Sequence, residues 1–194
     1  MLLYYTFLIV LALGTLPVHS EDTIQTSLTA LADTLTIQDK LPIGSLAPDF
    51  TLPDQSGNPV SLHGFKGSPV VIYFYPKDNT PGCTQESCDF RDNYALYQKH
   101  GAIILGISPD SVASHVKFIA GHSLPFTLLA DTEKTVLTQY GVWGRKSFAG
   151  KSYDGVIRST VVIDREGKVA NVWSPVSVGG HVAEVLSELE KISK

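Results

Sequence analysis

The amino-acid sequence predicts an α/β domain built on a mixed central β-sheet that is sandwiched by α-helices. The apolar run 70–76 (VVIYFYP) is rich in β-branched and aromatic residues, as in a central strand that is covered on both faces. A second such strand at 102–108 follows a helical segment, so the two strands should pair in parallel. Near the C-terminus, segments 159–163 and 169–173 flank a turn of the kind that joins antiparallel strands.

Helices and one further strand complete this pattern. The stretch from about Pro81 to His100 is the predicted helix between the first two strands. Helical patterns at 111–121 and 133–140 surround a short predicted strand at 126–130. A terminal helix begins after Gly179-Gly180, and its apolar stripe consists of Val182, Val185, Leu186 and Leu189.

The composition indicates one globular domain and excludes one class of partner. The chain has 194 residues, of which 43% are hydrophobic and 18% charged, which suffices to bury a sizeable core. Its formal net charge is -4, and it contains no run of lysine and arginine that could neutralise phosphates. We therefore expect no nucleic-acid partner.

The N-terminus has the pattern of a signal peptide at residues 1–20. Leu2 to Leu13 form an apolar run too short to span a bilayer, and Pro17 precedes residues 18–20 (VHS), which suit a signal-peptidase site. We expect export to the periplasm or the medium and no stable membrane span after cleavage. The alternatives are an uncleaved hydrophobic anchor or a buried N-terminal helix, and without a signal the protein would be cytoplasmic.

Residues 21–42 form an N-terminal extension ahead of the main domain at 43–194. Four apolar residues recur in it at helical spacing, which predicts a short amphipathic helix: Ile24, Leu28, Leu31 and Leu35. Four acidic residues against one lysine make attraction to anionic lipid improbable, so we expect this helix to pack against the main domain.

The segment 76–88 (PKDNTPGCTQESC) runs from a strand end through a loop into a helix. Thr80 is a natural N-cap, and Pro81 suits the first helical position because its missing N–H costs nothing there. Cys83 then falls in the first helical turn, where free backbone N–H groups and the positive end of the helix dipole favour an anion. The sequence therefore predicts a reactive thiolate at Cys83.

Two acidic neighbours oppose this ionisation. Asp78 and Glu86 disfavour the thiolate through like charge, so a cation has to compensate if the thiol is strongly activated. An arginine is the expected partner, and the residues by themselves leave Arg91, Arg145 and Arg158 open.

Cys88 is five residues from Cys83 and should point away from the inward helix face that carries Cys83. On one helix their Cα atoms would be roughly 8 to 9 Å apart, beyond the ~7 Å limit for a disulfide, so the helix has to unwind before they can bond. So short a loop would gain only about 2 kcal/mol, which argues against a static structural disulfide. Scattered histidines and the lack of a paired metal motif argue against a metal site.

Several motifs in order now point to a family. The chain contains Pro76-x3-Thr80-x2-Cys83 followed by Cys88, together with APDFTLPD at 47–54, YFYP at 73–76, FRD at 90–92, GVWG at 141–144 and RST at 158–160. On these residues the chain from about Ile43 onward resembles the peroxiredoxins, specifically the bacterioferritin comigratory protein or peroxiredoxin Q group. The resemblance implies a thioredoxin-like fold.

The resemblance also implies roles for individual residues. Cys83 corresponds to the peroxidatic cysteine, Thr80 to the hydroxyl that orients thiolate and peroxide, and Pro76 to the residue that shields the site. Arg158 corresponds to the charge partner of the thiolate, and Cys88 to the resolving cysteine that forms an intramolecular disulfide with Cys83.

An enzyme of this family reduces hydrogen peroxide and organic hydroperoxides without a cofactor and is recycled by a thioredoxin-like or other dithiol reductant. The resemblance favours a monomer. The main alternative is a thioredoxin-like thiol-disulfide carrier of the cell envelope, although such proteins use Cys-x-x-Cys. A second alternative is a non-enzymatic binding module that keeps only the fold.

Overall fold

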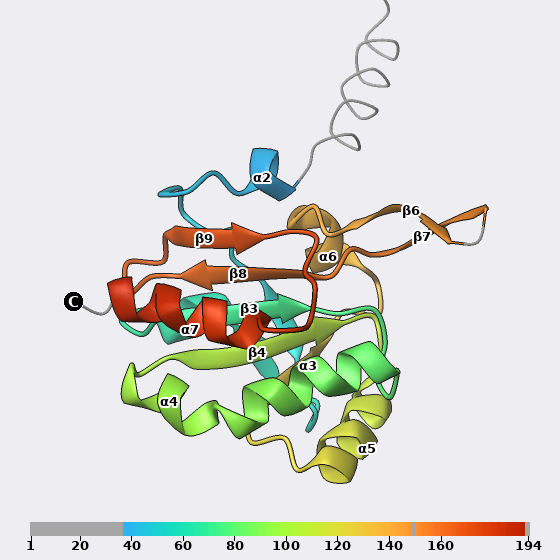
Figure 1. Ribbon diagram of the computed structural model, residues 1–194, viewed down its shortest axis with the longest axis horizontal. Coiled ribbons are helices and arrows are strands. Elements are labelled where there is room, and N and C mark those ends of the chain that lie inside the picture. The colour runs from blue at the N-terminus through green and yellow to red at the C-terminus, as the bar shows by residue number, and fades with distance from the viewer. Residues whose placement is uncertain (1–36, 149, 193–194) are drawn as a thin grey trace, which may run out of the picture. The chain divides into compact units, whose positions relative to one another are not determined.

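The computed structural model describes residues 37–148 and 150–192 of the chain. Its central sheet has five strands in the order β5-β4-β3-β8-β9 (Figure 1). The strands are β3 (Val70–Phe74), β4 (Ile103–Ser108), β5 (Thr127–Ala130), β8 (Ser159–Ile163) and β9 (Val169–Trp173). β3, β4 and β5 pair in parallel, whereas β8 pairs antiparallel with both β3 and β9. The predicted mixed sheet is confirmed.

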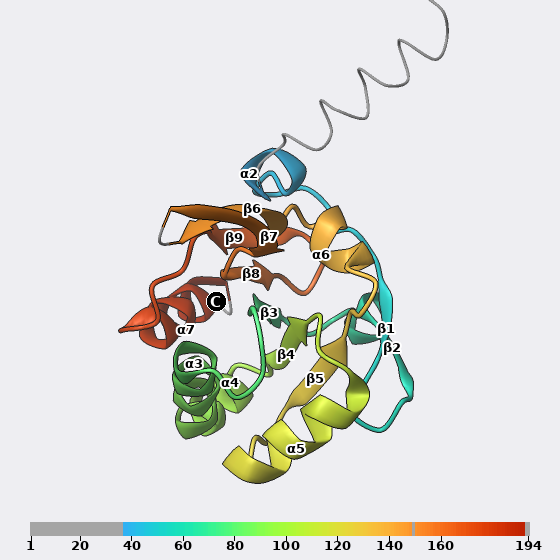
Figure 2. The same ribbon diagram turned by 90° about the vertical axis from the view of Figure 1, so that its right-hand side faces the viewer.

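Helices cover both faces of this sheet. They are α2 (Ile37–Lys40), the 3₁₀ helix η1 (Leu62–Phe65), α3 (Pro81–Asp92), α4 (Tyr94–Lys99), α5 (Val112–His122), α6 (Thr135–Gln139) and α7 (His181–Ile192). Figure 2 shows α3, α4, α5 and α7 on one face and α6 on the other. The predicted helices at 111–121, at 133–140 and after Gly180 are therefore present, within a few residues of their expected ends.

Each face of β3 contributes to a separate hydrophobic core, because successive strand residues point to opposite sides. Val71 and Tyr73 pack with the apolar side chains of α3, α4, α5 and α7. Ile72 and Phe74 pack with those of α6, η1 and the N-terminal strands. All five residues of β3 are buried, as an apolar run without alternation predicts.

Two hairpins lie outside the sequence prediction. One joins β1 (Thr51–Pro53) to β2 (Pro59–Ser61), and the other joins β6 (Trp143–Phe148) to β7 (Lys151–Val156). The sequence of the second hairpin, WGRKSF and KSYDGV, carries few apolar residues and no regular alternation. Trp143 and Val156, which pair at one end of the hairpin, pack in or against the core, but the strands lack the alternation from which periodicity could have predicted them.

The single helix expected from Pro81 to His100 is wrong, because the structure breaks it at Asn93 into α3 and α4. The side-chain Nδ2 of Asn93 donates to the Asp89 carbonyl oxygen at 2.9 Å. A short amide side chain that bonds to the preceding turn competes with the helical ladder, which explains the break. The first strand is also shorter than expected and ends at Phe74 instead of Pro76.

The predicted signal peptide and most of the predicted extension at 21–42 lie outside the described residues. Of the extension, the structure describes α2 and the residues that follow it. Ile37 and Leu41 belong to the core beside α6, so apolar packing of the main domain includes side chains ahead of residue 43. Among the residues that the structure describes, no helix has the length and apolarity needed to cross a bilayer.

Gly106 in β4 provides a test of this packing. A Cβ at Gly106 would lie 2.6 Å from the Tyr73 ring and 2.6 Å from the Leu128 side chain, both of which are fully buried. We expect Gly106→Ala to lower the free energy of unfolding by about 1–3 kcal/mol, measured by urea denaturation. Gly121→Ala in α5 is the control, because a Cβ there meets nothing within 4 Å. This substitution should raise the free energy of unfolding by no more than ~1 kcal/mol. Equal stability of Gly106→Ala and the parent would contradict this packing.

Candidate active site

Cys83 lies in the first turn of α3 and is only 1% exposed. Thr80 occupies the N-cap position and Pro81 the first helical position, as the sequence predicts. The Thr80 side chain does not cap the helix, however, because its Oγ1 donates to the Lys77 carbonyl oxygen at 3.0 Å. The N–H groups of the first turn are thus left without a capping side chain close to the thiol.

Arg158 is the cation beside this thiol. Its Nη2 donates to the Cys83 sulfur at 3.2 Å, and its Nη1 donates to the Glu86 carboxylate. The pairing of β3 with β8 explains this contact across 75 residues. Phe74, the last residue of β3, is opposite Ser159, the first residue of β8, so the loop after β3 and Arg158 before β8 lie at the same end of these two strands. A Cβ at Gly82 would lie 3.4 Å from Nη2, so the small residue lets the guanidinium approach α3.

The two other arginines that the sequence left open have different partners. Arg91 pairs with Asp92 at 2.8 Å and donates to the His122 carbonyl oxygen at 2.8 Å. Arg145 pairs with Asp154 at 3.4 Å on the surface of the β6–β7 hairpin. Neither ion pair includes Cys83, so the geometry selects Arg158 from the three candidates.

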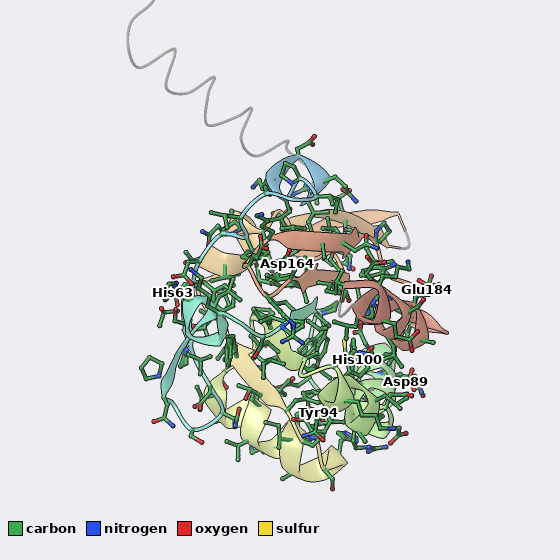
Figure 3. The ribbon with its side chains drawn as sticks, turned by 90° about the vertical axis from the view of Figure 1, so that its left-hand side faces the viewer. His63, Asp89, Tyr94, His100, Asp164 and Glu184 are labelled. Atoms are coloured by element: carbon green, nitrogen blue, oxygen red, sulfur yellow. The ribbon has the colours of Figure 1, made fainter. Side chains whose placement is uncertain are left out.

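Glu86 is completely buried one turn after Cys83, and it shares Arg158 with the thiol. Burial raises the pKa of Glu86 to about 7, even though the charge and the hydrogen bond of Arg158 lower it. Asp89, on the outer side of α3 (Figure 3), adds a smaller upward push. For Arg158 itself, burial lowers the pKa, but the negative charges of Glu86 and Cys83 outweigh burial and raise the pKa above its ordinary value. The guanidinium therefore stays charged whether or not Glu86 is ionised.

Asp78 does not act on the thiol in the way the sequence suggested. Its carboxylate turns toward α5, where it accepts hydrogen bonds from Ser114 Oγ at 2.7 Å and His115 Nδ1 at 2.9 Å. The Tyr75 hydroxyl donates to its other oxygen at 2.7 Å. The charge of Asp78 is therefore engaged away from Cys83, which leaves Glu86 as the carboxylate that shares the arginine.

Cys88 and Cys83 are both free thiols on the same helix. Cys83, Ser87 and Phe90 of α3 are buried whereas Cys88 is half-buried, in agreement with the expectation that Cys88 points away from the inward face of Cys83. Pro76 is also half-buried and lies in the loop between β3 and Thr80. The five predicted site residues thus fall on one loop, one helix and the residue before β8, and the distance between Arg158 and Cys83 is that of a direct contact.

Two further basic side chains near Arg158 had not been expected from the sequence. Lys146 in β6 donates to the Val156 carbonyl oxygen at 2.8 Å, and burial and the Arg158 charge lower its pKa while Cys83 opposes the shift. His181 donates to or accepts from Thr160 Oγ1 at 2.7 Å, and burial and Arg158 lower its pKa to about 4. Lys146 lies on the unpredicted hairpin and His181 at a helix start, so neither had a signal in the sequence.

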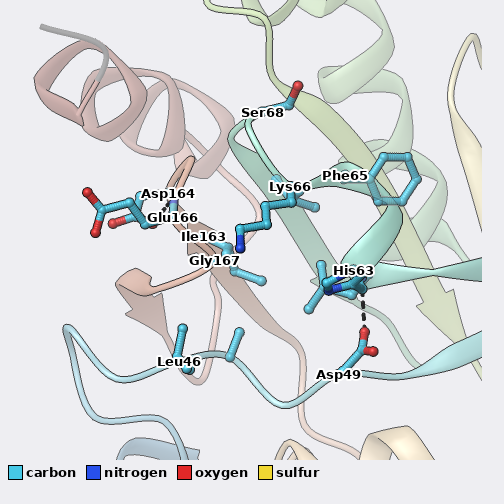
Figure 4. A pocket seen from close by; sticks show the side chains of 13 residues that line it. Leu46, Asp49, His63, Phe65, Lys66, Ser68, Ile163, Asp164, Glu166 and Gly167 are labelled. Carbon is cyan, nitrogen blue, oxygen red and sulfur yellow. Dashed lines mark hydrogen bonds between the residues drawn. The ribbon is translucent and has the colours of Figure 1, made fainter.

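A pocket of about 280 Å³ lies elsewhere on the domain, between residues 46–49, η1 and the turn after β8 (Figure 4). Its lining includes Lys66, Asp164 and Glu166, and the Asp49 carboxylate accepts a hydrogen bond from the His63 N–H at 3.0 Å. None of the predicted site residues lines it. Among the described residues, no group of three or more His, Cys, Asp or Glu side chains is arranged to hold a metal ion.

A buried thiol that touches an arginine at a helix start, beside a mixed α/β sheet, defines the class of thioredoxin-fold thiol peroxidases. The model of the AhpC/TSA family matches residues 43–172, and the chain belongs to this family. It is 51% identical over 147 residues to the putative peroxiredoxin bcp of Coxiella burnetii, covering 76% of this chain and 97% of the relative. It is 47% identical over 152 residues to the peroxiredoxin Bcp of Bacillus subtilis, with 78% and 97% covered.

Solved structures show the same similarity. Xanthomonas campestris peroxiredoxin Q superposes with a TM-score of 0.71 at 39% identity, covering 75% of this chain and 92% of that chain. The peroxidoxin BcpB of Mycobacterium tuberculosis superposes with a TM-score of 0.70 at 38% identity, with 78% and 98% covered. The expected group, the thioredoxin-like fold and the thiol-dependent peroxidase activity are confirmed, with a peroxide as substrate and a thiol as reductant. The alternative of a disulfide carrier is not favoured.

Glu86 predicts a specific pH dependence of stability. In the folded chain the pKa of Glu86 is about 7, whereas an exposed glutamate has an ordinary value of 4.5, so the folded state binds more protons between these pH values. Stability should therefore fall as pH rises from about 4.5 to about 7, by on the order of 3 kcal/mol from this group. We expect Glu86→Gln to remove this part of the slope in urea denaturation at a series of pH values. Glu190→Gln at an exposed position is the control and should keep the slope; the same slope in Glu86→Gln as in the parent would refute the assignment.

Proposed function

We propose that Cys83 is the peroxidatic thiol of this thiol-dependent peroxidase and that Cys88 is its resolving thiol. The contact of 3.2 Å between Arg158 Nη2 and the Cys83 sulfur carries the proposal. A charged donor at this distance favours the thiolate over the thiol, and the thiolate is the nucleophile that attacks peroxides. The position at the start of α3 supports the same form through the free N–H groups of the first turn.

In the first step the Cys83 thiolate attacks one peroxide oxygen in line with the O–O bond. An S–O bond forms, the O–O bond breaks, and the leaving alkoxide or hydroxide takes up a proton and departs as alcohol or water. Arg158 and the first-turn N–H groups stabilise the negative charge that moves from sulfur to the leaving oxygen. Thr80 orients the peroxide and Pro76 limits access of water. The product on Cys83 is a sulfenic acid.

In the second step Cys88 attacks the sulfenic sulfur, forming the disulfide and releasing water. Both cysteines lie within α3, which is an unbroken helix from Pro81 to Asp92, and their Cα atoms on an ideal helix are roughly 8 to 9 Å apart. The first turns of α3 therefore have to unwind. A thioredoxin-like dithiol protein then reduces the disulfide, and we propose that the enzyme works as a monomer.

Serine replacements separate these two roles. Cys83→Ser should abolish the consumption of hydrogen peroxide in the presence of a thiol reductant, because no other thiolate touches Arg158. Cys88→Ser should still reduce one peroxide per chain but should then accumulate sulfenic or sulfinic acid on Cys83, measured by intact mass spectrometry. Turnover retained in Cys83→Ser would disprove its role, and disulfide formation in Cys88→Ser would disprove that of Cys88. Far-ultraviolet circular dichroism of both variants checks that the fold is retained.

We also propose that the protein is exported through cleavage after Ser20. The family match begins at residue 43, and the apolar run from Leu2 to Leu13 falls in the stretch before it. An exported enzyme would take its electrons from an extracytoplasmic thioredoxin-like domain.

N-terminal sequencing of the protein purified from its native cells tests this export. The expected mature chain begins at Glu21, because residues 18–20 suit the signal-peptidase site. A mature chain that begins at Met1 would contradict the proposal.

A further inference from the structure

A buried hydrogen-bond network joins the active-site loop to α5. Its centre is the Asp78 carboxylate, which accepts hydrogen bonds from Tyr75 Oη at 2.7 Å, Ser114 Oγ at 2.7 Å and His115 Nδ1 at 2.9 Å. Asp78 is only 4% exposed. Burial raises its pKa, but the hydrogen bonds from His115, Ser114 and Tyr75 outweigh that effect and lower it overall. The carboxylate is thus held as an anion by donors from two elements.

Asp78 connects this network to the loop that carries two of the predicted site residues. Asp78 is two residues after Pro76 and two residues before Thr80, in the loop that leads into the first turn of α3. Its backbone N–H also donates to Asp110 Oδ2 at 2.9 Å, and Asp110 is held in turn by Ser108 Oγ at 2.8 Å. The loop is therefore fastened at its midpoint to the end of β4 and to α5.

His115 takes part through one nitrogen only. It is fully buried in α5, and while Nδ1 faces Asp78, its Nε2 is a buried atom with no hydrogen-bond partner among the described residues. An unpaired buried polar atom costs stability, whereas an apolar side chain of similar size would fill the same space without that cost. Packing alone therefore does not explain why residue 115 is a histidine, whereas the hydrogen bond from His115 to Asp78 does explain it.

We propose that Asp78 and His115 are positioning residues, which hold the loop with Pro76 and Thr80 in the form that reduces peroxide and so control how the Cys83 sulfenic acid reacts next. This inference rests on the proposed function of Cys83 and Cys88. The network acts on the reacting sulfur through the loop and the start of α3 and touches neither substrate nor sulfur.

Two reactions compete for the sulfenic acid. Cys88 thiol plus Cys83 sulfenic acid gives the disulfide plus water, and this reaction requires the start of α3 to unwind. A second hydroperoxide plus the sulfenic acid gives sulfinic acid plus the corresponding alcohol or water, and this reaction uses the folded site. Because the network fastens the loop directly before α3, it opposes unwinding. Loosening the network should slow the first attack on peroxide and should also shift the sulfenic acid toward the disulfide.

The test is His115→Phe compared with His115→Asn. The phenyl ring keeps the bulk but donates nothing to Asp78, whereas the Asn amide places a donor near the position of Nδ1 and dispenses with the unpaired Nε2. In His115→Phe we expect the ratio of sulfinic acid to disulfide, after a fixed excess of hydrogen peroxide, to fall about tenfold, the effect of losing one hydrogen bond to a charged group. The rate constant of the first peroxide reaction should fall as well. His115→Asn should restore both values toward those of the parent, although it leaves a small cavity. Mass spectrometry of quenched samples measures the ratio.

Two further variants keep the test decisive. Ser114→Ala removes a single donor from the half-buried edge of the network and should shift the ratio in the same direction by a smaller factor, which decides the question if His115→Phe does not fold. Asp131→Asn is the matched control, since this buried carboxylate accepts the N–H groups of Thr135 and Leu137 in α6 and has no contact with the loop. It should lower the melting temperature without moving the ratio.

The outcomes separate this inference from the proposed function. If the parent forms no sulfenic acid on Cys83, the proposed function fails and the inference fails with it. If the parent divides between disulfide and sulfinic acid but folded His115→Phe and Ser114→Ala divide in the same proportion, only the inference is overturned. An equal shift in Asp131→Asn would also overturn it, because global stability would then control the ratio.

Discussion

The structure of the site depends on the contact between the Cys83 sulfur and Arg158, a half-buried arginine whose guanidinium also pairs with Glu86. One nitrogen of the guanidinium faces the sulfur at 3.2 Å and another faces the Glu86 carboxylate. Burial disfavours the charge on Glu86 and raises its pKa to about 7, so near neutral pH this carboxylate competes only in part for the arginine. The positive charge is then available to the thiolate. The helix start adds its own N–H groups, and the sheet brings the two partners together.

The two partners of this contact are held differently: Arg158 is next to a rigid central strand, whereas Cys83 lies in a segment that has to change conformation. Arg158 directly precedes β8, which pairs with both β3 and β9 in the middle of the sheet and is buried along its whole length. Cys83, by contrast, lies in the first turn of a helix that follows a loop, and Asp78 in this loop is hydrogen-bonded to Asp110 and to α5. A site that alternates between two conformations needs such an asymmetry, because one partner has to keep its place while the other moves.

Local signals in the sequence predicted much of this structure, and long-range geometry accounts for what they missed. The buried strands, the helix that begins at Pro81 and the placement of Cys83 in its first turn follow from apolar runs and capping rules. The choice of Arg158 over Arg91 and Arg145 needed either a family resemblance or the register of β3 against β8, which no local pattern encodes. The β6–β7 hairpin had no apolar alternation to reveal it, and the break after α3 depends on one asparagine side chain.

That break has a consequence for the energy cost of each catalytic cycle. Beyond Asn93 the chain continues as α4, where the Tyr97 hydroxyl donates to the Val182 carbonyl oxygen at 2.6 Å and the ring lies fully buried. Because the backbone ladder is interrupted between the two helices, fraying that starts at Pro81 meets a natural end point before it reaches this anchor. The melted segment then stays within about a dozen residues. The aromatic core beneath it remains ordered as a template on which the helix can wind again in well under a millisecond.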